Sequence, residues 1–452
     1  YKSAIPSAIY LFEKVKSKSF RNEQINKSCD FELSRTTRIV SSIGKKLLKK
    51  EQQFIESVAL FYIADLAYQP SEYESGKMNN RLGGVNGPMA RSGSVLTLQN
   101  LLYDFSNENA LKALCDCMAD NSAFIRYRAL YILNYLWKFK HESFWKLYNT
   151  RLAIESDGAC FGRLIDCIHH EAIIAADLLN VKEACDKIVL RLREADDETI
   201  RDNWRLLIHA ILKIIYRHDK DWAFEYILKN IDIKEFSRNL VFEIRSSLNN
   251  FNPKDDFTEI LEKANVVFDI LMEILKFRFK KIQANGTLSI DMQDDFEIVD
   301  HVIQNLFFAF DHEGGNEKGR KLSDREKEAF YRKIKSLIEF AANESSNIEN
   351  GFMVLHTGYY FMMLLNILLP IDPANILKIS NTVALAASNN GFAYDRSALT
   401  EVVKLTECVI VDYKNILDDQ ENFANLIVIL DQFANSGSEE AIELIWRLRE
   451  AF

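Results

Sequence analysis

Glycine and proline are scarce in this sequence. Its 452 residues include only 16 Gly and 6 Pro, well below the usual shares of about 7% and 5%. A β-sandwich or β-barrel needs a turn about every 8 to 12 residues, and Gly and Pro form many of these turns. The shortage therefore argues against an all-β fold and favours helices.

Long uninterrupted apolar runs are also missing. The longest apolar stretch, residues 358–371, is interrupted by Asn366 and Pro370 and is shorter than the roughly 20 residues that span a bilayer. We interpret it as a buried helix and expect no membrane association. The chain begins with Tyr1 rather than Met and has no signal-type apolar core, so we expect it to be part of a longer protein.

The cysteines form no regular pattern. They are an odd number at irregular spacings, whereas a small secreted protein usually carries an even, regularly spaced set. Most lie in apolar helical contexts, which are usual for free cysteine. We therefore predict a cytoplasmic protein. The seven are Cys29, Cys115, Cys117, Cys160, Cys167, Cys185 and Cys408.

Helical periodicity is present along nearly the whole sequence. In the segment 54–66, apolar residues fall at positions 54, 55, 58, 61 and 62, which is the spacing of one face of an α-helix. Similar stripes recur along the chain, each about 12 to 25 residues long, joined by short polar loops. We predict an all-α fold: an α-solenoid of stacked helical hairpins, HEAT/TPR-like, with roughly 18 to 22 helices.

One window, at about residues 107–140, resembles a single HEAT repeat. Its first helix ends at a turn around Asp120, and either Asp120 or Ser122 is placed to cap the second helix. The small residue Ala129 allows the two helices to approach closely. The apolar residues that we expect to fill the seam between them are Ile125, Ile132 and Leu133.

Two segments break the helical pattern and divide the chain. One is rich in Gly and the other is polar, so we expect both to be loops with few apolar anchors that move during function. A capping-box pattern at Ser323 opens the helix after the second segment. The predicted parts are a basic helical segment (1–69), a Gly-rich loop (70–94), a helical-repeat array (95–311), a linker (312–322) and a C-terminal helical-repeat segment (323–452).

Basic residues gather near the N-terminus, although the whole chain carries a net charge of -9. Residues 1–60 contain 12 Lys and Arg against 6 Asp and Glu. A solvated face of a packed amphipathic helix is the favoured interpretation of such a charge run. Nucleic-acid binding through this segment is the alternative. The candidate contacts for that alternative are Lys45, Lys46, Lys49 and Lys50.

No local motif indicates a cofactor or a metal ion. A P-loop requires G-x-x-x-x-G-K-[ST], and the residues around Gly44 and Gly76 do not complete it. The Cys and His residues between Cys160 and Cys185 diverge on helical faces, whereas zinc needs converging ligands. We therefore expect no cofactor and no metal site in this chain.

Catalytic motifs are missing from the sequence as well. It contains no G-x-S-x-G and no H-E-x-x-H. His218 and His312 stand beside carboxylates at apparent helix ends, where helix capping explains the pattern. We expect no catalytic activity in this chain itself. An enzyme with dispersed catalytic residues is kept as a further alternative.

Aromatic residues are abundant, with 30 Phe, 17 Tyr and 5 Trp. Most are expected to fill the seams between helices. The densest run lies over 127–148, where three Tyr recur at i+4 steps and share one helix face. Solenoids also bind proteins through concave surfaces rich in aromatic and Arg side chains. The partner-binding candidates, with core packing as the alternative, are Tyr127, Tyr131, Tyr135, Trp137 and Trp145.

The last 80 or so residues resemble a known family. The resemblance is carried by Ile371-Asp-Pro-Ala-Asn-Ile-Leu-Lys-Ile-Ser, by Ala384-Leu-Ala-Ala-Ser-Asn-Asn-Gly-Phe-Ala-Tyr-Asp, and by the segment 423–452. They are similar to the C-terminal helical-repeat region of large bacterial STAND-type NTPases of anti-phage defence. The similarity covers under a fifth of the chain and includes no catalytic motif.

The resemblance implies a function for the chain. In that family the helical-repeat region is a sensor that recognises a foreign protein, and recognition drives oligomerisation and effector activation. It implies a phage-encoded protein as the partner and oligomers formed through the parent protein. The family's nucleotide-binding motifs have no counterpart in these 452 residues, so ATP binding is assigned to no residue here.

Overall fold

The computed structural model describes most of the chain. Within that part every regular element is a helix and there is no strand, as the sequence predicts. All structural statements below refer to the described residues, which are 9–10, 12, 49–64, 90–105, 107–138, 140–249, 256–285, 290–310, 322–347, 357–389, 396–435 and 442–446.

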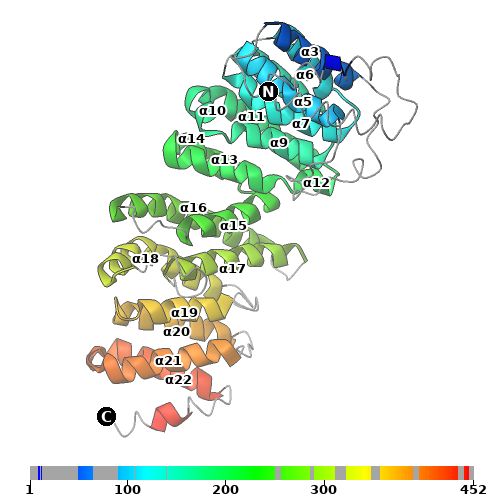
Figure 1. Ribbon diagram of the computed structural model, residues 1–452. Coiled ribbons are helices and arrows are strands. Elements are labelled where there is room, and N and C mark those ends of the chain that lie inside the picture. Colours follow the sequence, from blue (N-terminus) through cyan, green and yellow to red (C-terminus); the bar gives the residue numbers. More distant parts are fainter. Residues whose placement is uncertain are drawn as a thin grey trace. The chain divides into compact units, whose positions relative to one another are not determined.

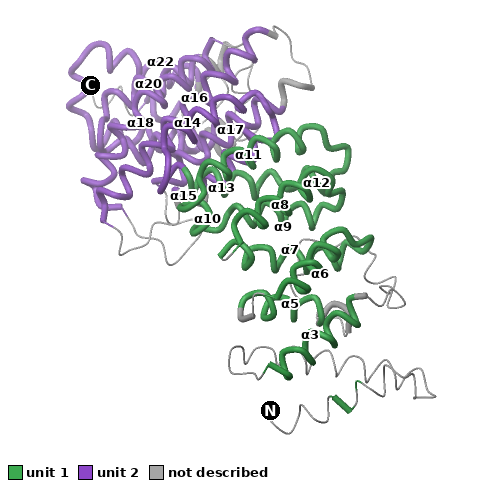
Figure 2. Tube along the Cα trace, turned by 90° about the horizontal axis from the view of Figure 1, so that it is seen from above, with its two compact units in different colours: residues 1–214 green, residues 215–452 purple. Residues whose placement is uncertain are grey.

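The chain forms two compact units, residues 1–214 and 215–452 (Figure 2). Each is a stack of antiparallel helices in chain order, an α-solenoid (Figure 1). The described residues contain nineteen α-helices, α3 and α5 through α22, together with one 3-10 helix, η2.

Unit 1 has two layers. Helices α3, α5, α7 and α9 pack side by side in one layer, and α9 contacts α12. Helices α6, α8 and α11 cover that layer, each contacting the helices next to it in the sequence. The bounds are α3 Lys49–Ala64, α5 Ala90–Phe105, α6 Glu108–Met118, α7 Ala123–Trp137, α8 His141–Ile154, α9 Gly158–Ile168, α10 Glu171–Ala176, α11 Leu178–Glu194, α12 Glu198–Arg201 and α13 Trp204–Arg217, whose last three residues belong to unit 2.

Unit 2 repeats the two-layer plan. Helices α15, α17, α19 and α21 form one layer, and α16, α18, α20 and α22 form the other. The bounds are α14 Lys220–Asn230, α15 Lys234–Asn249, α16 Phe257–Asn285, α17 Ile290–Phe310, α18 Asp324–Ser346, α19 Thr357–Leu368, α20 Pro373–Asn389, α21 Arg396–Asp412, η2 Lys414–Asp418 and α22 Gln420–Asn435.

The HEAT-like window folds as a helical hairpin of α6 and α7. The residues expected to fill its seam are buried: Ile125, Ala129, Ile132 and Leu133. The predicted side-chain cap does not form. Ser122 occupies the N-cap position of α7 without a side-chain bond, and Asp120 Oδ1 accepts from the backbone N–H of Ser122 itself at 2.8 Å rather than from an amide of the helix.

The long apolar stretch 358–371 and the helix start at Ser323 also form as predicted. The apolar stretch forms α19, whose buried face includes Phe361, Leu364 and Leu368. At the start of α18, the Glu326 carboxylate accepts from the backbone N–H of Ser323 at 2.8 Å, which is half of a capping box. Across the described residues no helix has the length and apolar character that crossing a membrane demands.

The described residues cover only part of the predicted divisions of the chain. Helix α5 begins at Ala90, so residues 90–94 of the predicted Gly-rich loop are helical. Residues 70–89 of that loop lie outside the described residues, as does the linker up to residue 321. The boundary between the two compact units falls at 214/215, inside the predicted array 95–311. The five-part division remains a prediction.

Candidate protein-binding surface

The tyrosine stripe of α7 lies on a partly exposed face of that helix. Tyr131 is 40% exposed, and Tyr127 and Tyr135 are half-buried. The rings of Tyr131 and Tyr135 are 6.2 Å apart, as expected for side chains one turn apart. Because the opposite face of α7 fills the hairpin seam, the tyrosine face is the part that a partner can reach.

Neighbouring helices in the same layer extend this stripe. The Arg163 guanidinium carbon, from α9, lies 4.8 Å from the centre of the Tyr131 ring, which is a cation–π contact. On α5, the Gln99 side chain lies beside the Tyr135 hydroxyl, and Tyr103, one turn further along, is 55% exposed. We call this group the α5–α7–α9 surface; it consists of Gln99, Tyr103, Tyr131, Tyr135 and Arg163.

The polar groups of the α5–α7–α9 surface are mainly donors. Nη1 of Arg163 donates to Asp166 at 3.1 Å, and its Nε has no acceptor among the described residues. Burial, followed by the neighbouring Tyr131 hydroxyl, raises the pKa of Tyr135 above its usual value. The Tyr135 phenol is therefore neutral at physiological pH. Tyr and Arg side chains of this kind dominate the binding energy of many protein interfaces.

The two candidate tryptophans form a separate cluster. The indole N–H groups of Trp137 and Trp145 both donate to Asp177 Oδ2, at 2.8 and 3.1 Å. Trp137 stacks on His141 with a ring separation of 4.8 Å, and Trp145 is only 8% exposed. Although partial burial opposes ionisation, the two indole donors hold the pKa of Asp177 below its usual value. These tryptophans join α7 and α8 to the start of α11, and Trp145 offers a partner little surface.

A buried carboxylate fixes α7 against the turn before α9. Glu155 is fully buried; it accepts from Arg126 at 2.8 and 3.1 Å and from Arg151 at 2.5 Å. The backbone N–H groups of Ser156 and Asp157 also donate to it. Burial acts to raise the pKa of Glu155, but these donors outweigh it and lower the pKa. The sequence pattern did not reveal this group, because Arg126 and Glu155 are 29 positions apart.

Close backbone contact fixes the other side of α9. A side chain at Gly158 would overlap the backbone oxygen of Thr199, and one at Gly162 would overlap Asn203. Asn203 Nδ2 donates to the carbonyl oxygens of Gly158 and Thr199 at 3.0 and 2.9 Å. Glycine is needed here because α9 touches α12 with no room for a Cβ atom. Arg163 is therefore held on a helix that is anchored on both sides.

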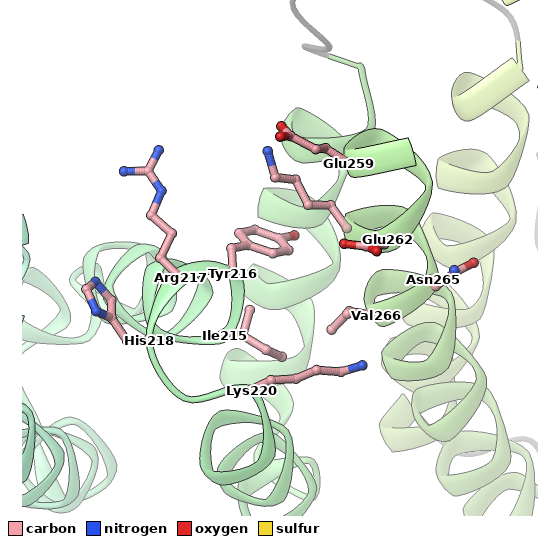
Figure 3. A pocket seen from close by; sticks show the side chains of 10 residues that line it. Ile215, Tyr216, Arg217, His218, Lys220, Glu259, Glu262, Asn265 and Val266 are labelled. Carbon is pink, nitrogen blue, oxygen red and sulfur yellow. The ribbon is translucent and has the colours of Figure 1, made fainter. Parts of the chain in front are cut away.

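A pocket of about 450 Å³ lies in unit 2, between the end of α13 and the start of α16 (Figure 3). Its walls carry both signs of charge: Arg217 and Lys220 come from the α13–α14 side, and Glu259 and Glu262 come from α16. His218 was a sequence candidate because carboxylates adjoin it. Its neighbour Asp219 caps α14, accepting from the N–H of Trp222 at 3.1 Å, which confirms the capping interpretation.

The remaining sequence candidates are dispersed. Lys49 and Lys50 are exposed at the start of α3, whereas Lys45 and Lys46 lie outside the described residues, as does His312. Nucleic-acid binding by the basic segment stays a prediction of the alternative function.

The Cys candidates of α9 and α11 are buried, and His169 is half-buried at the end of α9. Burial raises the pKa values of the Cys167 and Cys185 thiols to about 12. Burial, followed by the charge of Lys213, lowers the pKa of His169 to about 4. These groups are therefore neutral at physiological pH, and among the described residues no three His, Cys, Asp or Glu side chains converge as a metal site would require.

Comparison with known proteins gives only distant likeness. No family model matches the sequence, and no curated protein sequence matches it. A crystal structure of Kap121p is similar over 97% of this chain and 51% of that chain, with 10% identity and a TM-score of 0.42. A crystal structure of importin beta is similar over 96% of this chain and 56% of that chain, with 10% identity and a TM-score of 0.31. The chain spans about half the length of both proteins.

Proposed function

We propose that this chain is a protein-binding helical-repeat scaffold that contacts its partner through the α5–α7–α9 surface. The cation–π contact between Arg163 and the exposed Tyr131 is the observation that carries the proposal. Aromatic and Arg side chains are enriched at interface hot spots, because they bury large areas and still donate hydrogen bonds. The layered solenoid presents these side chains on a broad surface, which suits a protein better than a small molecule.

The finer proposal is that the scaffold is the sensor of a larger defence NTPase and detects a phage-encoded protein. Its support is the resemblance of residues 371–452 to the helical-repeat ends of STAND-type NTPases. In this proposal nucleotide chemistry and oligomerisation belong to the parent protein. The chain contributes recognition, and no residue in it is assigned to catalysis.

Position-specific photocrosslinking tests the coarse proposal. The photoreactive residue p-benzoylphenylalanine replaces Tyr131 in the full chain, or replaces Leu190 as the control. Leu190 is also exposed, but it lies on α11 in the covering layer. We expect a defined protein adduct from position 131 and none from position 190.

The same experiment in bacterial cells, with and without phage infection, tests the finer proposal. An adduct that forms at position 131 only after infection, and that contains a phage protein, supports the sensor function. An adduct with a host protein in uninfected cells would support the scaffold proposal and contradict the proposal that the chain detects a phage protein. Equal crosslinking from positions 131 and 190 would reject the α5–α7–α9 surface as the binding site.

A further inference from the structure

The exposed stripes of α15 and α17 in unit 2 meet in a ladder of cross-helix contacts. Lys234 on α15 pairs with Asp294 on α17. One turn further, Arg238 pairs with Glu297. In both cases a cation of α15 faces a carboxylate of α17.

The next cation of α15 in this ladder meets no carboxylate. The guanidinium carbon of Arg245 lies 3.7 Å from the centre of the Phe308 ring of α17, which is close, face-on stacking. Among the described residues Arg245 has neither an ion pair nor a side-chain hydrogen bond. Burial lowers the pKa of its guanidinium, yet an Arg side chain stays charged at physiological pH. Stacking occupies one face of the guanidinium and leaves its edge of N–H donors for another group.

Two further aromatic side chains lie on the helices that form this contact and next to it. The Phe308 ring lies 5.7 Å from that of Tyr360 on α19. Phe242, one turn before Arg245 on the same stripe of α15, is 53% exposed. We call Phe242, Arg245, Phe308 and Tyr360 the Arg245 platform. It joins a partly buried cation to aromatic side chains, the combination that holds a carboxylate within a protein interface.

We propose that the Arg245 platform is a docking site for an acidic segment of a protein partner, with one Asp or Glu carboxylate paired to Arg245 and an adjacent apolar side chain against Phe242. We choose this occupant on charge complementarity. Lys234 and Arg238 each face a carboxylate of α17, whereas Arg245 faces none in the described part of the chain. A nucleic acid fits less well. Phosphate-backbone binding uses several cations, whereas the neighbouring cations Lys234 and Arg238 are already paired with those carboxylates.

This inference rests on a surface in unit 2 and does not require the α5–α7–α9 surface of unit 1. Its test therefore has a separate readout. The probe is a bead-displayed library of random decapeptides, which is incubated with the labelled full chain. Fluorescence anisotropy then measures the affinity of the best-binding peptide. The net charge of -9 opposes diffuse attraction of acidic peptides, so their enrichment needs a local site.

Three variants distinguish the outcomes. Arg245→Met keeps the apolar stem and removes the guanidinium, and Phe308→Leu keeps apolar volume and removes the aromatic face. Arg238→Met is the matched control, since it removes an Arg from the same stripe that already has a partner. Circular dichroism and thermal melts confirm that each variant is folded.

We expect the wild-type chain to enrich peptides in which Asp or Glu adjoins an apolar residue. Arg245→Met should lower the affinity for the best-binding peptide by about tenfold or more. Phe308→Leu should lower it by a few fold, and Arg238→Met by less than about twofold. Enrichment without acidic residues, or equal binding by wild type and Arg245→Met, would overturn the proposal. Loss of binding to a 20-nucleotide single-stranded DNA on Arg245→Met, without acidic-peptide enrichment, would assign the site to nucleic acid instead.

Discussion

Glu155 shows what a single buried carboxylate does in this fold. It receives charged hydrogen bonds from Arg126 on α7 and Arg151 on α8, and backbone donors from the turn before α9. Arg191 on α11 donates to its main-chain oxygen at 2.6 Å. Isolated burial of these charges would be costly, but the group is stable because almost every oxygen has a donor.

Replacing Glu155 by Gln should destabilise unit 1 by about 3 kcal/mol at pH 7, because two Arg side chains lose their counter-charge. The pKa of Glu155 is lowered in the folded state, so its contribution is complete above the unfolded value of about 4.3. It is lost as the pH falls through the lower, folded pKa. Urea denaturation at pH 7 and pH 3 should therefore show a difference between wild type and Glu155→Gln that shrinks at pH 3.

The control for Glu155 is Glu108→Gln. Glu108 also pairs with a cation, Lys140, but its side chain is largely exposed, so the change should cost less than about 0.5 kcal/mol. A Glu155→Gln variant as stable as this control at pH 7 would contradict the role given to the buried carboxylate.

Gly158 offers a second residue-scale test. Gly158→Ala should cost about 1 to 3 kcal/mol, because the new methyl group overlaps the backbone oxygen of Thr199 and forces α9 away from α12. Gly358→Ala on α19 is the matched control. Nothing lies within 4 Å of a Cβ atom there, so Ala should be neutral or slightly stabilising. Chemical denaturation of both variants measures this, and equal stabilities would reject the close-contact account.

Residue-scale contacts were the least predictable from sequence. Stripe spacing is local, so the buried positions Ile125, Ala129 and Leu133 could be read directly. The Arg126–Glu155 pair and the contact of Gly158 with Thr199 join residues far apart in sequence. The tertiary fold brings them together, and the local spacing of residues does not predict such contacts.

At the scale of single elements, α7 serves two purposes. One face fills the seam with α6, and the other carries the tyrosines of the α5–α7–α9 surface. The i+4 spacing predicted that three tyrosines share a face. It did not predict Arg163, because which helix lies beside α7 depends on the order of packing. Nor did spacing predict that Trp137 and Trp145 both donate to Asp177, because that contact also depends on how the helices pack.

Helix α18 allows a test of an element that the sequence did predict. Ser323→Ala should cost about 1 kcal/mol, because it removes the N-cap hydroxyl that contacts Glu326 at 2.9 Å. Hydrogen exchange of the amides in the first turn of α18 should accelerate. Ser346→Ala at the other end of α18 is the control, since its exposed hydroxyl donates only to Asn343 O. Unchanged exchange in Ser323→Ala would show that the cap does not define the helix start.

At the scale of the whole molecule, composition and periodicity together gave the fold class. Few Gly and Pro and recurring stripes are sufficient to predict stacked helices, because each amphipathic helix must bury its stripe against a neighbour. The division into units at 214/215 was not predicted, since no Gly- or Pro-rich segment marks it. The STAND-type resemblance concerns function, and it remains the basis of a proposal.

The central claim is that a protein partner docks on the α5–α7–α9 surface, and the affinity of the crosslinked partner tests it most directly. Calorimetric titration of that partner compares wild type with Tyr131→Ala, Arg163→Ala and the control Leu190→Ala. We predict that Tyr131→Ala and Arg163→Ala each weaken binding by about tenfold or more, while Leu190→Ala stays within about twofold of wild type. Binding within about twofold of wild type for all three variants would contradict the claim.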